Sequence, residues 1–326
     1  MGTGIKRQTS WPLLIYGLRT ATEAAARAAY DWIGRGEKHR GDVVAAEAMR
    51  VQLSKLPIDG VVVVGEGDKG ISPGFYNGEQ LGDPRHRTKF DIAIDPLEGT
   101  SYVAKGMTNA MSVIAMAPRG SMFDPGPAFY MEKFVAPPAA RGKIDPTAPV
   151  AEKLDTLSRV LGKPVGEITV FVLEKPRHRR LVERIHGAGA RVALYPAGDV
   201  AGALMAAIPD SGIDALMGTG GTLEGIISAS AVRALGGEFL GRLDPQLATE
   251  KAEVRKIGMD TETWHPVEDL VRSDEVYFCA TGITTGLLFE GVERTKHHER
   301  VQSLFIAGTS GERQVLTTFH RRGDLA

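Results

Sequence analysis

Short apolar segments alternate with helix-like segments in the second half of the chain, and this alternation limits the possible folds more than any other feature. Three predicted strands fall at residues 168–173, 191–195 and 214–217. Each is followed by a predicted helix, at residues 179–186, 199–208 and 223–235. Strands that alternate with helices in this way predict a parallel or mixed sheet with helices on both faces.

The first half has a different order of elements. Residues 13–33 predict an Ala- and Leu-rich helix, and Asp42 is placed to cap a second one. Four predicted strands follow, at residues 60–65, 90–95, 109–117 and 129–135. The first half is therefore expected to be a pair of helices followed by a sheet.

The turn-forming prolines and glycine of residues 137–149 mark a linker. We therefore expect one domain over residues 1–145 and a second over residues 146–326. A late strand at residues 275–280 precedes a hairpin-like pair, 301–307 and 314–319, and these last strands can pack on either sheet.

Composition excludes several classes of function. The chain has 326 residues, with 39 Lys and Arg against 40 Asp and Glu, and this balance argues against a nucleic-acid-binding surface. The single cysteine, Cys279, rules out an internal disulfide or a multi-cysteine zinc site and suits a reducing cytosol. No signal peptide and no apolar run of roughly 18 residues is visible, so we expect a cytoplasmic protein with no membrane partner.

The strongest motif is Asp-Pro-Leu-Glu-Gly-Thr at residues 95–100, directly after a predicted strand that ends at Ile94. Asp95 and Glu98 can both face one hard cation, and Gly99 allows a ligand to approach the backbone closely. Thr100 adds a hydroxyl that can hold a water. The alternative is a plain strand-to-helix turn in which Asp95 and Thr100 cap backbone amides.

Two further acidic residues also lie at predicted strand ends. Glu66 is flanked by Gly65 and Gly67 after a four-valine strand, and Glu224 lies in the glycine-rich segment 218–225 between a strand and a helix. Each motif alone fits an ordinary turn or a helix-dipole interaction. Together they favour phosphoryl chemistry with several divalent cations, which needs carboxylates from several loops.

Basic residues suit the phosphate groups of such a substrate. The Lys-Pro-Arg sequence at residues 175–177 ends a strand and opens a helix, and Lys38 precedes Asp42 by four residues. Arg179 and Arg180 are expected on a solvated helix face. The histidines show no metal-ligand spacing, and Cys279 lies in an apolar strand, which is typical of a core residue.

Taken together, these motifs make the chain resemble the class II fructose-1,6-bisphosphatases of the GlpX type, within the lithium-sensitive, metal-dependent sugar-phosphatase superfamily. The resemblance runs over residues 21–319 and rests on residues 34–38 with Asp42, 65–67, 95–100, 130–133, 175–178, 220–221 with 224–225, and 280–284. Glu98, where the wider superfamily usually has aspartate, is specific to the GlpX type. With the order of elements, the resemblance predicts a layered α/β/α/β/α sandwich, with an N-terminal metal-binding domain and a C-terminal substrate-binding domain.

The resemblance also implies a reaction and a site. The reaction would be hydrolysis of the 1-phosphate of fructose 1,6-bisphosphate with two or three Mn²⁺ or Mg²⁺ ions, in a dimer or tetramer. The implied metal ligands are Asp42, Glu66, Asp95, Glu98 and Glu224. The catalytic residues would be Asp42, Glu66 and Thr100, of which Asp42 and Thr100 would orient the attacking water. The substrate contacts would be Lys38, Glu98, Gly99, Thr100, Tyr130, Lys175, Pro176, Arg177, Gly198, Asp199 and Gly221.

Two departures from the family pattern leave alternatives open. The family carries two acids around the glycine at Gly198, whereas this chain has Ala197 and Asp199, and an alanine cannot hydrogen-bond a sugar hydroxyl. The segment of residues 68–73 is less acidic than usual, which would weaken an auxiliary cation site or a closing loop. The alternatives are a sedoheptulose-1,7-bisphosphatase or other ketose-phosphate phosphatase, an inositol-monophosphatase-like enzyme, and a catalytically impaired sugar-phosphate-binding protein.

Overall fold

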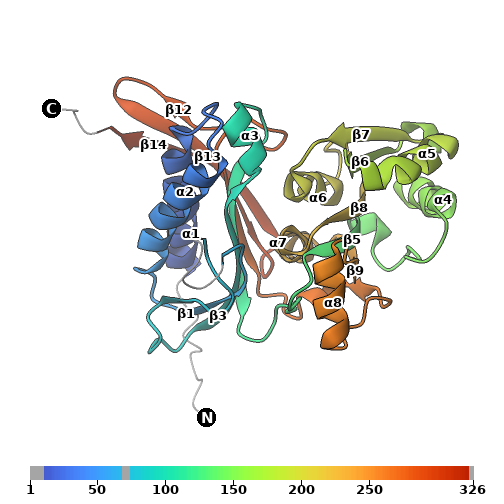
Figure 1. Ribbon diagram of the computed structural model, residues 1–326. Helices are drawn as coiled ribbons and strands as arrows, with labels where there is room; N and C mark the ends of the chain where they lie inside the picture. The colour runs from blue at the N-terminus through green and yellow to red at the C-terminus, as the bar shows by residue number, and fades with distance from the viewer. Residues whose placement is uncertain (1–10, 68–73, 323–326) are drawn as a thin grey trace, which may run out of the picture.

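The computed structural model describes residues 11–67 and 74–322, whose helices and sheets form five layers (Figure 1). Helices α1 (Trp11–Tyr30) and α2 (Lys38–Leu53) cover one face of the first sheet. Helices α6 (Asp199–Ala207) and α7 (Thr222–Leu235) lie between the two sheets, and α7 packs on strands of both. Helices α4 (Val150–Leu161) and α5 (Arg179–Gly187) cover the outer face of the second sheet. The predicted α/β/α/β/α sandwich is confirmed.

The first sheet has eight strands among the described residues, in the order β12-β13-β11-β4-β3-β1-β2, with β14 paired to β13. Strands β1 and β3 are parallel, and the other pairs are antiparallel. The bounds are β1 (Asp59–Val64), β2 (Gln80–Gly82), β3 (Lys89–Glu98), β4 (Met111–Pro118), β11 (Tyr277–Gly282), β12 (Glu293–Arg294), β13 (His298–Ala307) and β14 (Glu312–Arg321).

The second sheet is mixed, as expected. Over the described residues it has six strands in the order β10-β9-β5-β8-β6-β7, of which β6 pairs in parallel with β7 and β8. Its bounds are β5 (Tyr130–Ala136), β6 (Thr169–Leu173), β7 (Arg191–Tyr195), β8 (Ala215–Gly221), β9 (Glu238–Leu243) and β10 (His265–Pro266). The remaining α-helices are α3 (Thr100–Lys105), α8 (Ala248–Lys256) and α9 (Val267–Leu270). Short 3₁₀ turns lie at Pro138–Ala140, Val165–Glu167 and Pro176–His178.

The two sheets do not follow the expected boundary at residue 145. Strand β5, which precedes that boundary, lies in the middle of the second sheet, and β11 to β14 return to the first sheet. The chain therefore enters the second layer near residue 130 and leaves it again before residue 277. The division into domains over residues 1–145 and 146–326 stays a prediction, with the sheets favouring an earlier first boundary.

Three local predictions were wrong. Asp42 does not cap α2, because this helix begins at Lys38 and Asp42 lies one turn inside it. Strand β3 does not end at Ile94 but continues to Glu98. The glycine-rich residues 218–221 are not a loop but the end of strand β8, where they pair with β5 from Tyr130 to Lys133. Glycine without a side chain can remain in a strand that approaches other groups closely.

The core explains why α1 forms where it does. Leu14, Leu18, Ala21, Ala25 and Ala29 are almost fully buried, and their spacing of three or four residues places them on one face. That face packs on α2 and on the first sheet. No helix in the described part of the chain is both long enough and apolar enough to cross a membrane.

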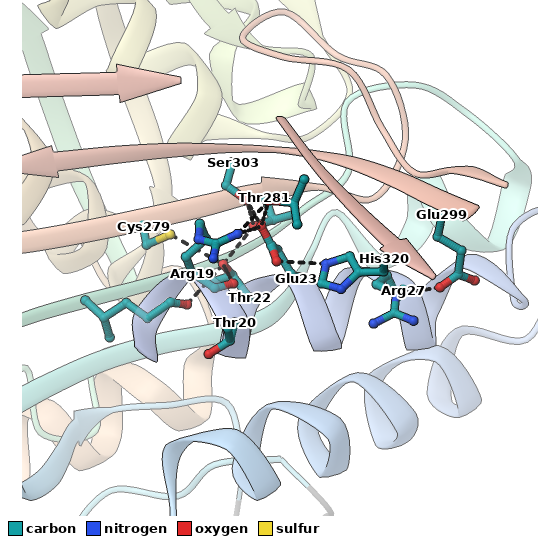
Figure 2. A network of polar contacts seen from close by, with 12 residues as sticks. Arg19, Thr20, Thr22, Glu23, Arg27, Cys279, Thr281, Glu299, Ser303 and His320 are labelled. Atoms are coloured by element: carbon teal, nitrogen blue, oxygen red, sulfur yellow. Dashed lines mark hydrogen bonds and ion pairs between the residues drawn. The ribbon is translucent and has the colours of Figure 1, made fainter. Parts of the chain in front are cut away.

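A buried polar network joins α1 to the late strands (Figure 2). The Glu23 side chain is only 1% exposed, and it accepts hydrogen bonds from Arg19 at 2.9 Å and Thr318 at 2.7 Å. A ring nitrogen of His320 lies 2.8 Å from its second carboxyl oxygen. Burial raises the pKa of Glu23, but the hydrogen bonds from His320 and Thr318 and the charge of Arg19 outweigh it, and the net pKa is lowered. The ionised carboxylate thus fastens β14 to α1.

Replacing Glu23 by Gln is expected to destabilise the protein by about 3 kcal/mol, because it removes the charge from a buried hydrogen-bonded pair. Thermal unfolding should show a Tm lower by roughly 5–10 °C. Since the folded-state pKa is below the ordinary 4.5, this stabilisation is complete above about pH 4.5 and is lost as the pH falls further. The exposed Glu47 of α2 is the control, and Glu47→Gln should leave the Tm nearly unchanged. An equal Tm for Glu23→Gln and the parent would contradict this role.

Candidate active site

A bulge at the end of β3 brings two of the predicted carboxylates to the same face of the sheet. Asp95 pairs with Val113 of β4, and Glu98 pairs with Met111, so three steps along β3 match two along β4. Residues three apart in a regular strand point to opposite faces, and the extra residue of a bulge restores a common face. The charge of Glu98 accordingly helps to raise the pKa of the Asp95 carboxyl group. Pro96 is tolerated there because a bulge frees it from the ladder.

Gly99 and Thr100 turn the chain from β3 into α3. Gly99 has a φ of +89°, and a Cβ atom at this position would lie 2.9 Å from the Tyr102 ring. The Thr100 hydroxyl lies 3.0 Å from Oδ1 of Asp42 and 3.2 Å from the carbonyl oxygen of Leu97, and it can donate to either. The Thr100 hydroxyl and the Asp42 carboxylate are therefore in contact, although the two residues are 58 positions apart.

Glu66 and Glu224 complete the group of predicted carboxylates. Glu66 follows β1, and Glu224 lies in the first turn of α7. Burial and the charges of Glu224 and Asp42 raise the pKa of Glu66 to about 7. Glu66 is also exposed to solvent, so water screens part of this repulsion. The three carboxylates, which come from three different elements, are close enough to repel one another.

The other members of the group show the same repulsion. Burial and the charges of Glu66, Glu98 and Glu224 hold the pKa of Asp95 well above its usual range. Burial, followed by the charges of Glu224 and Asp199, also holds the pKa of Glu98 well above its usual range. Burial also raises the pKa of Asp42 to about 6, although the hydrogen bond from Thr100 and the charge of His39 lower it. The structure thus brings all five predicted metal ligands into one electrostatic cluster.

This cluster has the chemistry of a divalent-cation site. All its donors are carboxylate oxygens, which hard cations such as Mg²⁺ and Mn²⁺ prefer. Within the described residues, no three His, Cys, Asp or Glu side chains are arranged round a single point as a finished cage. The donor set fits a divalent metal, and side-chain rotation of the mutually repelling carboxylates would be needed to close round it.

Asp199, the predicted sugar ligand, is held by a buried cation. The Lys133 side chain on β5 is 1% exposed, and its ammonium donates to Oδ2 of Asp199 at 2.5 Å and to the carbonyl oxygen of Gly221 at 2.7 Å. Its charge also lowers the pKa of Glu224, which burial and Asp199 raise. A Cβ atom on Gly221 would lie 1.8 Å from Oε2 of Glu224, so a side chain at this position would displace the carboxylate.

The loop before α6 is held by residues of α3 and of the segment before β4. The Tyr102 hydroxyl lies 2.8 Å from both the amide nitrogen and the carbonyl oxygen of Ala197. Gly198 follows with a φ of +84°, and a Cβ atom there would lie 2.8 Å from the Asn109 side chain. Predicted residues Gly198 and Asp199 are therefore positioned by contacts from α3 and the segment before β4.

The predicted phosphate-binding residues lie at the other end of the site. The Arg177 guanidinium lies 5.1 Å from the centre of the Tyr130 ring and donates two hydrogen bonds to the carbonyl oxygen of Thr219, at 3.0 and 2.6 Å. Tyr130 pairs with Gly221 across the sheet, which links this end to the carboxylate cluster. Lys175 is half-buried and Pro176 is exposed in the adjoining turn.

Two predictions about site residues have a different outcome. Lys38 is exposed at the first position of α2, and none of the contacts described for it joins it to the carboxylates. The less acidic segment of residues 68–73 lies outside the described residues.

Two residues that position the site were not predicted. Lys133 belongs to the 130–133 motif on which the resemblance rests, but no role follows from that motif, and a lysine beside apolar strand residues indicates a buried charge with a partner. Glu250 is 2% exposed and accepts backbone N–H groups from Phe129 at 2.6 Å and Tyr130 at 2.9 Å, so it fixes the start of β5. No local pattern in the sequence indicates that contact.

Comparison with known proteins identifies the family. The family model described as bacterial fructose-1,6-bisphosphatase, glpX-encoded, matches residues 13–320. The chain is 40% identical over 312 residues to fructose-1,6-bisphosphatase 1 class 2 of Escherichia coli K12, across 92% of each chain. The same figures hold for the fructose-1,6-bisphosphatase class 2 of Shigella flexneri.

A solved structure of an extragenic suppressor from Pyrococcus furiosus is 12% identical, with a TM-score of 0.30 over 60% of this chain and 68% of that one. We draw nothing from a similarity at that level. The family is identified by the match of the family model over most of the chain and by the 40% identity over 92% of it. The chain belongs to the family of bacterial, glpX-encoded fructose-1,6-bisphosphatases.

Proposed function

We propose that this chain hydrolyses the 1-phosphate of fructose 1,6-bisphosphate to fructose 6-phosphate and inorganic phosphate, with a divalent cation as cofactor. The family and the class 2 fructose-1,6-bisphosphatases that the chain resembles support this activity. The observation that carries it in the structure is the bulge that turns Asp95 and Glu98 to one face, among Asp42, Glu66 and Glu224.

The proposed metal ligands are Asp42, Glu66, Asp95, Glu98 and Glu224, and Mn²⁺ or Mg²⁺, as two or three ions, suits their oxygen donors. A divalent cation bound there would supply Lewis-acid activation of water and neutralise negative charge on the reacting phosphate. The carboxylates repel one another as they stand, so their arrangement favours the binding of positive charge.

The chain's own residues would position the water and the sugar. Asp42 accepts a hydrogen bond from Thr100, which fixes the hydroxyl while leaving its lone pairs able to accept a hydrogen bond from the attacking water. Asp199, held by Lys133, would accept hydrogen bonds from sugar hydroxyls. Arg177, Lys175 and Tyr130 would hold the 6-phosphate, which stays on the product.

Replacing Thr100 by Ala is expected to lower kcat by about 100- to 1000-fold, with KM changed by only a few-fold, because the hydroxyl orients the attacking water and is one of many substrate contacts. Steady-state assays of phosphate release would measure both parameters. Thr100→Ser keeps the hydroxyl and serves as the control, with most of the activity retained. If the Thr100→Ala protein kept the parent's kcat, the Thr100 hydroxyl would have no role in the mechanism.

The experiment that tests the function is an assay of phosphate release on a panel of fructose 1,6-bisphosphate, sedoheptulose 1,7-bisphosphate and fructose 1-phosphate. It would be run with Mn²⁺, with Mg²⁺ and with a chelator. The parent should be active with a divalent cation and inactive with the chelator, and Glu66→Gln should be strongly impaired. No turnover on any substrate would contradict the enzyme function in favour of a sugar-phosphate-binding protein, and an unimpaired Glu66→Gln would contradict the metal assignment.

The backbone of Ala197 is held by Tyr102, and its methyl side chain offers no hydrogen bond to a sugar hydroxyl, so this position favours a second candidate substrate. A preference for sedoheptulose 1,7-bisphosphate that Ala197→Asp reverses would assign specificity to this position.

We also propose a cytoplasmic enzyme that forms a dimer or tetramer. The single cysteine and the family support this proposal, and light scattering on the purified protein would test the assembly.

A further inference from the structure

A cavity of about 750 Å³ lies on the outer face of the second sheet, beside helices α4 and α5. This volume is within the usual range for a small-molecule site. Of the proposed metal and substrate residues, only Arg177 lines it. Asp199 and Glu224 belong to α6 and α7, on the other face of the same sheet. The cavity is therefore separate from the carboxylate cluster and borders the candidate active site at two residues, Arg177 and Lys133.

The wall of this cavity is strongly basic. Five of its side chains with cationic groups are Lys153, Arg177, Arg180, Arg184 and Arg242. Lys133 also lines it, but its ammonium is bound by Asp199. Arg180 is exposed, as the sequence predicted, and it lies one helical turn from Arg184 on the same cavity wall.

Few negative charges balance these cations. Two carboxylates line the cavity, and both have partners. Glu132 accepts a hydrogen bond from Arg242 at 2.6 Å, and Asp244 accepts one from the Thr219 hydroxyl at 2.6 Å. Among the described residues, no carboxylate forms an ion pair with the four other cationic side chains, which are Lys153, Arg177, Arg180 and Arg184.

An aromatic ring lies within this basic wall. Lys153 lies 5.6 Å and Arg242 lies 5.2 Å from the centre of the Trp264 ring. Burial and the nearby charge of Arg242 lower the pKa of Lys153, against the opposing charges of Glu132 and Asp145. The positive charges of Lys153 and Arg242 repel each other, and a bound anion would reduce this electrostatic repulsion.

We propose that this cavity binds a small organic phosphate, such as a phosphate monoester, at a site distinct from that of the substrate. The two N–H donors of an arginine guanidinium match the spacing of phosphate oxygens. Arg180 and Arg184 present two such guanidinium groups from one helix. Lys153 adds a third cation from α4. The Trp264 ring offers a surface for any flat group that the phosphate carries.

The cavity is coupled to the active site through Arg177, and this second step rests on the proposed function. Arg177 holds the Thr219 carbonyl, lies over Tyr130 and also lines the cavity. A phosphate that draws this guanidinium toward Arg180 takes it from the proposed 6-phosphate position. The occupied cavity therefore weakens binding of fructose 1,6-bisphosphate, and by linkage the substrate weakens binding of the phosphate to the cavity equally.

The binding step is tested on the full chain loaded with Mg²⁺, by titration with ribose 5-phosphate, adenosine 5′-monophosphate and adenosine. Binding would be followed by tryptophan fluorescence and by calorimetry, neither of which needs turnover. Both phosphates should bind and adenosine should not, and the fluorescence change should vanish in Trp264→Phe. Arg184→Ala should weaken binding at least about tenfold, the usual loss for one charge-assisted hydrogen bond.

Two control variants locate the binding. Arg179 neighbours Arg180 on α5 but does not line the cavity, and Lys175 belongs to the proposed substrate site alone. Arg179→Ala and Lys175→Ala should each bind the phosphates within about twofold of the parent. Unchanged binding in Arg184→Ala, or loss of binding in Lys175→Ala, would overturn the proposal, because the phosphate would then sit elsewhere.

The coupling is tested separately by steady-state kinetics. In the parent, ribose 5-phosphate should raise the KM for fructose 1,6-bisphosphate, and in Arg184→Ala this rise should be largely lost. The same rise in both proteins would mean competition at the substrate site and would overturn the coupling. An inactive parent that still binds phosphate at Trp264 would contradict the proposed function while leaving the binding site supported.

Discussion

Replacing Asp95 by Asn is expected to lower kcat for phosphate release by about a thousandfold or more. The proposed Lewis-acid contribution is worth several kcal/mol, and each 1.4 kcal/mol is a factor of ten in rate. Asparagine keeps the shape of the side chain and an oxygen that can accept the 2.9 Å hydrogen bond from the Leu97 amide. The variant thus removes a charge from the cluster while leaving the bulge in place.

The same substitution should not destabilise the metal-free protein. Burial and the charges of Glu66, Glu98 and Glu224 oppose ionisation of Asp95, so its charge costs the folded state free energy that asparagine does not. In a thermal unfolding assay we expect an unchanged or higher Tm without metal, and a smaller rise in Tm when Mn²⁺ is added. This combination of lost activity and retained stability distinguishes a metal ligand from a structural residue.

Asp91 provides a matched control on the same strand. It is 3% exposed, lies 3.4 Å from the Arg119 guanidinium and accepts a hydrogen bond from the Met122 amide at 3.1 Å. Asp91→Asn should lower the Tm and leave kcat near that of the parent. If Asp95→Asn instead lost stability and kept its kcat, Asp95 would be a structural residue of the bulge.

Replacing Lys133 by Met is expected to raise the KM for the substrate by about 10- to 100-fold and to destabilise the fold. The ammonium holds Asp199 at 2.5 Å and the Gly221 carbonyl at 2.7 Å, and methionine can hold neither. Asp199 would then be buried without its cation, which typically costs about 3–5 kcal/mol. Thermal unfolding should show a Tm lower by roughly 10 °C, and steady-state kinetics would give the KM.

Lys163 provides a control that distinguishes an effect on stability from an effect on the position of a site residue. Lys163 pairs with Asp214 at 2.8 Å in the same half of the molecule, and its partner is not a site residue. Lys163→Met should lower the Tm without a change in KM, whereas Lys133→Arg, which keeps the charge, should recover part of the loss. A Lys133→Met protein with the parent's KM would show that Lys133 serves the fold alone.

Much of the fold could be predicted because its signals are local. The alternation of apolar strands with helices predicted a parallel or mixed second sheet, and the Ala- and Leu-rich composition of residues 13–33 predicted α1. The end of β3 was misplaced because Pro96 normally interrupts a strand, and the bulge that accommodates it depends on pairing with β4. The glycine-rich sequence of residues 218–221 is typical of a loop, because glycine has a low strand propensity, but pairing with β5 overrides this preference.

In the site too, local motifs could be predicted, whereas contacts between distant residues could not. A joint role for Asp42 and Thr100 was implied by the resemblance, and in the structure the Thr100 hydroxyl donates a hydrogen bond to Asp42, while the role in orienting water stays a prediction. The roles of Lys133 and Glu250 could not be predicted, because their partners lie 66 and at least 120 positions away in the sequence. Only the folded sheet brings β5 against α6 on one side and the start of α8 on the other.

The proposed activity is tested most directly by following the reaction of the cation-loaded parent protein with fructose 1,6-bisphosphate by phosphorus NMR. We expect the 1-phosphate signal to be lost, while inorganic phosphate and fructose 6-phosphate appear in equal amounts. Resonances of fructose 1-phosphate would mean that the substrate binds in the opposite direction, with its 6-phosphate at the carboxylate cluster. An unchanged substrate spectrum with both Mn²⁺ and Mg²⁺ would contradict the proposed activity.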